Sequence, residues 1–157
     1  MYVPAIVDGL AIPLSPHAAT DNISAQVSAA DINWQTDLSK AEAQAKKENK
    51  LVLLDFTGSD WCGWCIKLNH DTFSKSEWAD YAKKNLVSVE VDFPRSKEQS
   101  ASLKSANDAL QKKYNVQGFP TIVVIKPDGT VVWTNEGYLA GGPKAMIDQI
   151  EKAKKKA

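Results

Sequence analysis

The sequence predicts an α/β fold in which a mixed central β-sheet is flanked by helices on both faces. Short apolar segments of strand length alternate along the chain with longer segments of helical periodicity. The first two strand segments are joined through a helical segment, which implies that they run parallel. A strong turn signal, Pro127-Asp128-Gly129, separates the last two strand segments and adds an antiparallel hairpin.

The elements follow in the order helix, strand, helix, strand, helix, hairpin, helix. Apolar residues recur at helical spacing from Trp34, and Asn49 is a plausible stop for that helix. The run from Leu51 to Phe56 is apolar except for Asp55, as expected for a strand buried on both faces. The remaining predicted elements are a helix from Cys62 to about Lys84 with a break near Ser74–Ser76, a strand over Leu86–Phe93, a helix ending at Tyr114, strands over Thr121–Ile125 and Val131–Trp133, and a last helix that begins near Pro143.

Length and charge exclude several classes of protein. The chain has 157 residues, enough for one domain, which we assign to residues 34–157. The preceding residues 1–33 lack Lys and Arg and carry no readable targeting signal, so we treat them as an extended N-terminal arm or a possible leader. Nineteen basic residues balance nineteen acidic ones, which argues against binding to nucleic acid. No apolar run is long enough to span a bilayer. We also expect the protein to be a monomer.

The only two cysteines, Cys62 and Cys65, are placed for redox chemistry. They follow a buried strand and a turn, and they open a helix, where free amides and the helix dipole stabilise a thiolate. Their spacing brings both sulfurs to the same side of the first helical turn, close enough to bond. We predict that Cys62 is the exposed attacking thiol and that Cys65, more buried, resolves the mixed disulfide.

A metal site is the main alternative for such a pair. A closed zinc site needs four ligands, whereas the chain offers only His17 and His70 besides the two cysteines. His17 lies in the arm, and His70 lies about two helical turns beyond Cys62. We therefore predict no bound metal and no cofactor.

Three separated segments resemble the thioredoxin superfamily. They are Leu54-Asp55-Phe56 before Trp61-Cys62-Gly63-Trp64-Cys65, then Tyr114 to Thr121 with the sequence Gly118-Phe119-Pro120, and Gly137 to Gly142 before the last helix. The loop from Gly58 to Cys62 is similar to that of bacterial thioredoxin-like proteins related to the C-terminal domain of the disulfide-bond reductant conductor. The resemblance covers roughly Trp34 to Ile150 and implies a thioredoxin fold.

The resemblance implies roles for three residues outside the cysteine pair. In the family, the residue at Pro120 has a cis peptide bond and faces the cysteines, and the backbone at Phe119 pairs with the bound substrate. Asp55 corresponds to a buried carboxyl that relays protons to the resolving cysteine. The loop from Asp55 to Cys62 is one residue longer here than in common thioredoxins, so capping of the turn by Asp55 is the alternative.

Two tryptophans complete the candidate site. Trp61 and Trp64 are candidate substrate-binding residues together with Phe119 and Pro120, although Trp64 packing inward is the alternative. Asp60 places a negative charge next to the motif, which would oppose thiolate formation at Cys62.

These features predict a thiol–disulfide oxidoreductase that exchanges disulfides with protein substrates and receives electrons from an upstream redox protein. We expect a reductase or isomerase outside the cytoplasm, in the periplasm, because the subgroup that the chain resembles is exported. The direction of electron flow is open, since all these activities use the same two sulfurs. The second hypothesis is a non-catalytic binding module, or a metal carrier, on the same fold.

Overall fold

The computed structural model describes residues 32–157, so the predicted arm lies outside the described residues except for its last two positions. A sheet of four strands forms the centre of the molecule. Across the sheet the strands are β2 (Leu86–Asp92), β1 (Leu51–Thr57), β3 (Thr121–Ile125) and β4 (Val131–Glu136). The helices are α1 (Leu38–Glu48), α2 (Gly63–Leu68), η2 (Asn69–Phe73), α3 (Ser76–Asn85), α4 (Ala101–Lys113) and α5 (Gly142–Lys156).

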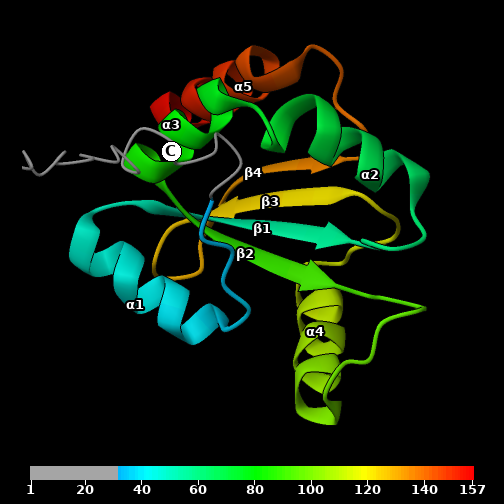
Figure 1. The fold of residues 1–157 in the computed structure, drawn as a ribbon. Coiled ribbons are helices and arrows are strands. Elements are labelled where there is room, and N and C mark those ends of the chain that lie inside the picture. Colours follow the sequence, from blue (N-terminus) through cyan, green and yellow to red (C-terminus); the bar gives the residue numbers. More distant parts are fainter. Residues whose placement is uncertain (1–31) are drawn as a thin grey trace, which may run out of the picture.

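The strand pairing is mixed, as predicted. β1 and β2 run parallel, with Asp55 opposite Glu90, whereas β3 runs antiparallel to both β1 and β4. β1 therefore lies in the interior of the sheet between two partners, and Figure 1 shows its carboxyl end leading into the loop before α2. This connection carries the cysteine pair to one end of the sheet.

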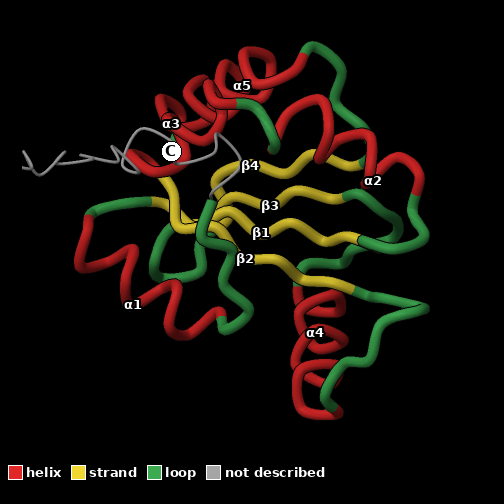
Figure 2. Tube along the Cα trace, viewed as in Figure 1, coloured by secondary structure: helices red, strands yellow, loops and turns green. Residues whose placement is uncertain are grey.

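Helices cover both faces of the sheet. α1 and α4 lie on one side and α2, α3 and α5 on the other, as Figures 1 and 2 show. Each side has its own apolar core: Ala41 and Ala45 of α1 pack on one face, and Trp78 of α3 with Met146 and Ile150 of α5 pack on the other. The side chains of β1 alternate between these two cores, which explains its continuous apolar sequence.

The helix boundaries follow from local residues. Asn49 adopts the left-handed conformation and ends α1, at the predicted stop. The long segment after the cysteines is broken before Ser76, as predicted, and it also contains the π-helical turn η2, which periodicity did not indicate. This turn buries Thr72 and Phe73 beneath α5, and Phe73 packs against Trp78 at 5.4 Å between ring centroids.

Replacing Ile150 by Ala should test the core beneath α5. Ile150 is fully buried, so the change should lower the free energy of unfolding by about 2–5 kcal/mol through lost burial and a new cavity. Gln149→Ala, at the exposed neighbouring position, should change it by less than about 0.5 kcal/mol. Urea denaturation measures both values. Equal losses in the two variants would contradict the assignment of this face of α5 to the core.

Candidate active site

The cysteine pair lies where β1 leads into α2. Cys62 is the N-cap of α2 and forms a disulfide with Cys65, with their Cα atoms 5.2 Å apart. The backbone N–H of Cys65 also points at the sulfur of Cys62, at 3.2 Å. A negative charge forming on that sulfur would meet a donor already in place, and this favours the thiolate.

The prediction that Cys62 is exposed is wrong. Cys62 is 7% exposed and Cys65 5% exposed, so both are buried to nearly the same degree. The disulfide joins the Cys62 side chain to Cys65 in the first turn of α2. What differs is their surroundings, since Cys65 and not Cys62 lines a hollow of about 310 Å³ on the side of Asp55.

Trp61 fixes the loop in front of the cysteines. Its ring packs so closely on Gly58 that a Cβ atom there would lie 2.3 Å from Trp61 Cε2, so only glycine fits. The indole N–H donates to the carbonyl of Phe93 at 2.7 Å, which ties the loop to the end of β2. The loop closes with a hydrogen bond from the Cys62 N–H to the Gly58 carbonyl at 2.8 Å.

The segment before β3 meets Trp61. The peptide bond between Phe119 and Pro120 is cis. The Phe119 ring packs edge-on against Trp61 at 5.9 Å and lies 5.1 Å from the ring of Phe93. The carbonyl of Pro120 accepts a hydrogen bond from the Gly137 N–H. The pairing of β3 with β4 begins at Thr121, so Phe119 lies just before the paired residues.

Trp64 points outward rather than into the core. It is 59% exposed, and its ring lies 5.4 Å from that of Tyr138, in the turn before α5. The Tyr138 hydroxyl donates to Asp71 at 2.6 Å, and Asp71 also pairs with Lys67 and contacts His70. The hydrogen bond with His70, followed by those from Lys67 and Tyr138, holds the pKa of Asp71 well below its usual range. Trp64 therefore presents an exposed aromatic ring that packs on Tyr138. His70 belongs to the group of surface side chains that hold Tyr138 through Asp71.

Asp55 lies within β1, behind the cysteines. It is buried, its Oδ1 has no hydrogen-bond partner, and it lines the same hollow as Cys65. Burial raises the pKa of Asp55 to about 8, and the negative charges of Glu90 and Asp92 add to the rise. The turn before the cysteines is capped by Asp92 and not by Asp55. Asp92 accepts hydrogen bonds from the backbone N–H of Ser59 at 3.0 Å and from the Ser59 hydroxyl at 2.6 Å.

Asp60 anchors a neighbouring loop, a role that the sequence did not indicate. Its carboxylate accepts three backbone N–H groups, from Arg95 at 3.0 Å, Ser96 at 2.7 Å and Lys97 at 3.1 Å. These hydrogen bonds, led by that from Arg95, lower the pKa of Asp60. The carboxylate thus holds the loop after β2, and its effect on the Cys62 thiolate stays a prediction.

Sequence reasoning missed three residues of this site, namely Glu90, Arg95 and Tyr138. Glu90 reaches Asp55 across the strand pair, and the Arg95 guanidinium stacks 3.7 Å above the Trp61 ring. Tyr138 comes from a turn 74 positions after Trp64 in the numbering. Only the parallel pairing of β1 with β2 could have pointed to Glu90. No local pattern marks the other two.

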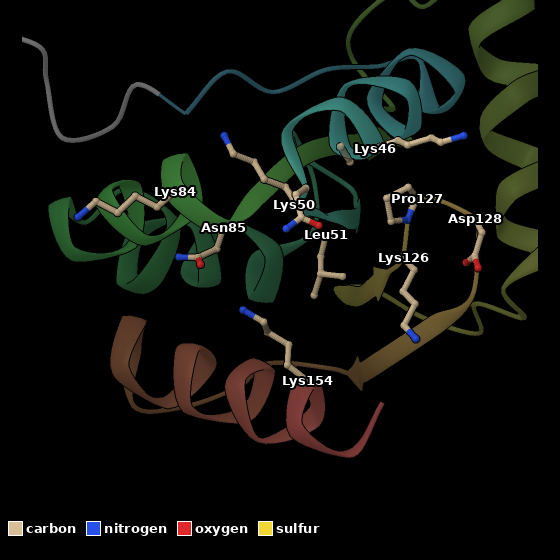
Figure 3. A pocket seen from close by; sticks show the side chains of 11 residues that line it. Lys46, Lys50, Leu51, Lys84, Asn85, Lys126, Pro127, Asp128 and Lys154 are labelled. Carbon is tan, nitrogen blue, oxygen red and sulfur yellow. The ribbon is translucent and has the colours of Figure 1, made fainter.

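A larger hollow, of about 710 Å³, lies at the opposite end of the sheet (Figure 3). Lysines from several elements surround it, among them Lys46, Lys84 and Lys154. These three stand in the last turns of α1, α3 and α5, where a cation offsets the negative end of the helix dipole. Figure 3 shows Lys46 and Lys84 extending away from the hollow. The helix ends account for these three lysines, and the hollow is separate from the cysteine site.

Neither a metal cluster nor a membrane helix is present in the described part of the chain. Residues 32–157 contain no group of three or more His, Cys, Asp or Glu side chains placed to hold a metal ion. Among the same residues, no helix has both the length and the apolar character needed to cross a membrane.

Comparison with known proteins identifies the family. A family model described as a thioredoxin-like domain matches residues 38–154. The chain is 35% identical over 129 residues to the disulfide bond reductase DsbH of Chlamydia pneumoniae, covering 82% of this chain and 76% of that protein.

Solved structures agree with this assignment. A DsbH oxidoreductase matches with a TM-score of 0.76 and 34% identity over 83% of this chain and 89% of the other. The reduced C-terminal domain of Neisseria meningitidis DsbD matches with a TM-score of 0.55 and 25% identity, over 74% of this chain and 93% of that domain. With its paired cysteines at the start of α2, this chain belongs to the thioredoxin-like family and is a thiol–disulfide oxidoreductase.

Proposed function

We propose that the domain of residues 34–157 reduces disulfides of protein substrates, with Cys62 as the attacking thiol and Cys65 as the resolving thiol. The observation that carries this proposal is that Cys65 shares a hollow with the buried carboxyl of Asp55, whereas Cys62 caps the helix outside it. A thiol that must lose its proton late in the reaction belongs beside an acid–base group. The name of its relative, a disulfide bond reductase, supports the direction of electron flow.

The reaction is two successive exchanges. The Cys62 thiolate attacks one sulfur of the substrate disulfide, and the other substrate sulfur leaves as a thiolate. Asp55 then takes the proton of the Cys65 thiol, and the Cys65 sulfur attacks Cys62 Sγ. The second substrate thiolate leaves, and the Cys62–Cys65 disulfide of this structure forms. Two electrons pass to the substrate, and an external dithiol protein must return them before the next cycle.

The surroundings of Cys62 support a polypeptide substrate. Trp61 and Trp64 flank the cysteine in sequence, and Trp64 is largely exposed on its Tyr138 support. The Phe119 ring packs against Trp61, and its backbone precedes the paired residues of β3, a position suitable for pairing with an extended chain. We further propose that the protein works outside the cytoplasm, in the periplasm, as a monomer supplied by an upstream thiol protein.

Cys65→Ser should trap the substrate. Without a resolving thiol, the mixed disulfide on Cys62 persists, so a stable adduct with insulin chains should appear by mass spectrometry under non-reducing conditions. Cys62→Ser should form no such adduct, and insulin reduction should fall by about a hundredfold or more in both variants. An adduct on Cys65 would reverse the two roles. A peptide complex that survives replacement of both cysteines, without reduction by the wild type, would favour a binding module.

Asp55→Asn should slow the resolving step. Because the pKa of Asp55 is raised to about 8, the carboxylate becomes available as a base as the pH approaches that value. In the wild type, release of the second substrate thiol should therefore accelerate with pH up to about 8, and the variant should be slower there by about tenfold or more. Single-turnover release from a preformed Cys62 mixed disulfide measures this step.

Glu90→Gln is the matched variant for the same experiment. It keeps Asp55 but removes a charge that raises its pKa, so the acceleration should begin at lower pH. If neither substitution alters the pH profile, Asp55 is not the base.

Protein stability reports the Asp55 pKa independently of catalysis. The carboxyl ionises near its ordinary value of 3.8 in the unfolded chain but near 8 when folded. Between these pH values the folded state holds a proton that the unfolded state has released, so stability falls as the pH rises through this window. Asp55→Asn should flatten this dependence of the unfolding free energy, measured by urea denaturation at pH 5 and pH 8.

A further inference from the structure

The Arg95 side chain lies on the aromatic surface in front of the cysteines. Its guanidinium carbon is 3.7 Å from the centroid of the Trp61 ring, and Trp61 directly precedes Cys62. A stacked guanidinium uses its face for the ring and keeps its N–H donors at its edges. These edges match the two oxygens of a carboxylate.

The backbone that carries Arg95 is held in place. Asp60 accepts the Arg95 N–H together with those of the next two residues, and Trp61 donates to the carbonyl of Phe93. Asp60 and Trp61 belong to the loop before Cys62, so Arg95 is positioned relative to the reacting sulfur. An ordered cation loses little further freedom on binding, which favours recognition.

Arg95 also differs from the other cations of the site. Lys67 pairs with Asp71 at 2.7 Å, and Lys97 lies 3.5 Å from Asp92. Arg95 makes no ion pair with a carboxylate among residues 32–157. Asp60 meets its backbone, and the guanidinium is directed to the ring of Trp61.

From this geometry we infer that Arg95 is a specificity residue that binds an acidic side chain of the protein substrate, close to the cysteine attacked by Cys62. The inference rests on the proposed function and names the kind of substrate. Because Arg95 stacks on the residue next to Cys62, the Asp or Glu should lie close in sequence to the reacting cysteine of an extended substrate segment. The exposed Trp64, supported by Tyr138, offers an apolar surface to another part of the segment.

Two disulfide-bonded peptides that differ only in Asp or Asn two positions from the cysteine test this inference. The wild type should reduce the Asp peptide with a kcat/KM about three- to tenfold higher at low salt, and added salt should shrink the ratio. Arg95→Gln should bring the ratio close to one. Arg95→Glu should reverse the preference when a Lys peptide is compared with the Asp peptide. Lys104→Gln removes one positive charge from an exposed position of α4 and should keep the wild-type ratio.

The contrary outcomes are distinct. An unchanged ratio in Arg95→Gln would overturn the inference. If Arg95→Gln slows the reduction of both peptides equally and raises the pKa of Cys62 in the pH profile of its alkylation, Arg95 stabilises the thiolate. That result would also overturn the inference. The Cys62→Ser, Cys65→Ser double variant allows peptide binding to be measured by fluorescence anisotropy. If the wild type reduces neither peptide but the double variant still prefers the Asp peptide, only the proposed function fails.

Discussion

Strand β1 lies between β2 and β3, and the apolar faces of helices pack over both of its faces, so its side chains from Val52 to Thr57 are all buried. This burial dictates the chemistry that the strand can carry. Asp55 is the one carboxyl in β1, and the surrounding apolar cores keep water from stabilising its charge. The same packing fixes the carboxyl end of the strand, and therefore the place where the loop begins that delivers Cys62 and Cys65.

Features that depend on neighbours in sequence could be predicted. The order of elements, the parallel pair of strands, the stop at Asn49 and the break before Ser76 all follow from local periodicity and turn residues. The cysteine pair was also predictable, because its spacing and its position after a buried strand determine that the two sulfurs meet.

Features that depend on contacts through space could not be read in this way. Arg95 lies in a polar stretch with no periodicity, and only the folded chain stacks it on Trp61. The low exposure of Cys62 is of the same kind, since it results from packing in the folded chain. Sequence also left two alternatives for Asp55, and a residue on the neighbouring strand, Asp92, turned out to cap the turn.

Two aspartates five positions apart show how environment assigns opposite roles to one residue type. Asp55 is enclosed with Glu90 nearby and an Oδ1 that lacks a partner, so it holds its proton to about pH 8 and suits proton transfer. Asp60 receives three backbone N–H groups, which stabilise its charge and make it a fixed anchor for the loop of Arg95. Because that loop comes from the end of β2 and the cysteines come from the end of β1, Asp60 joins two adjacent strand ends. The proton chemistry behind the disulfide and the surface in front of it therefore rest on the same parallel strand pair.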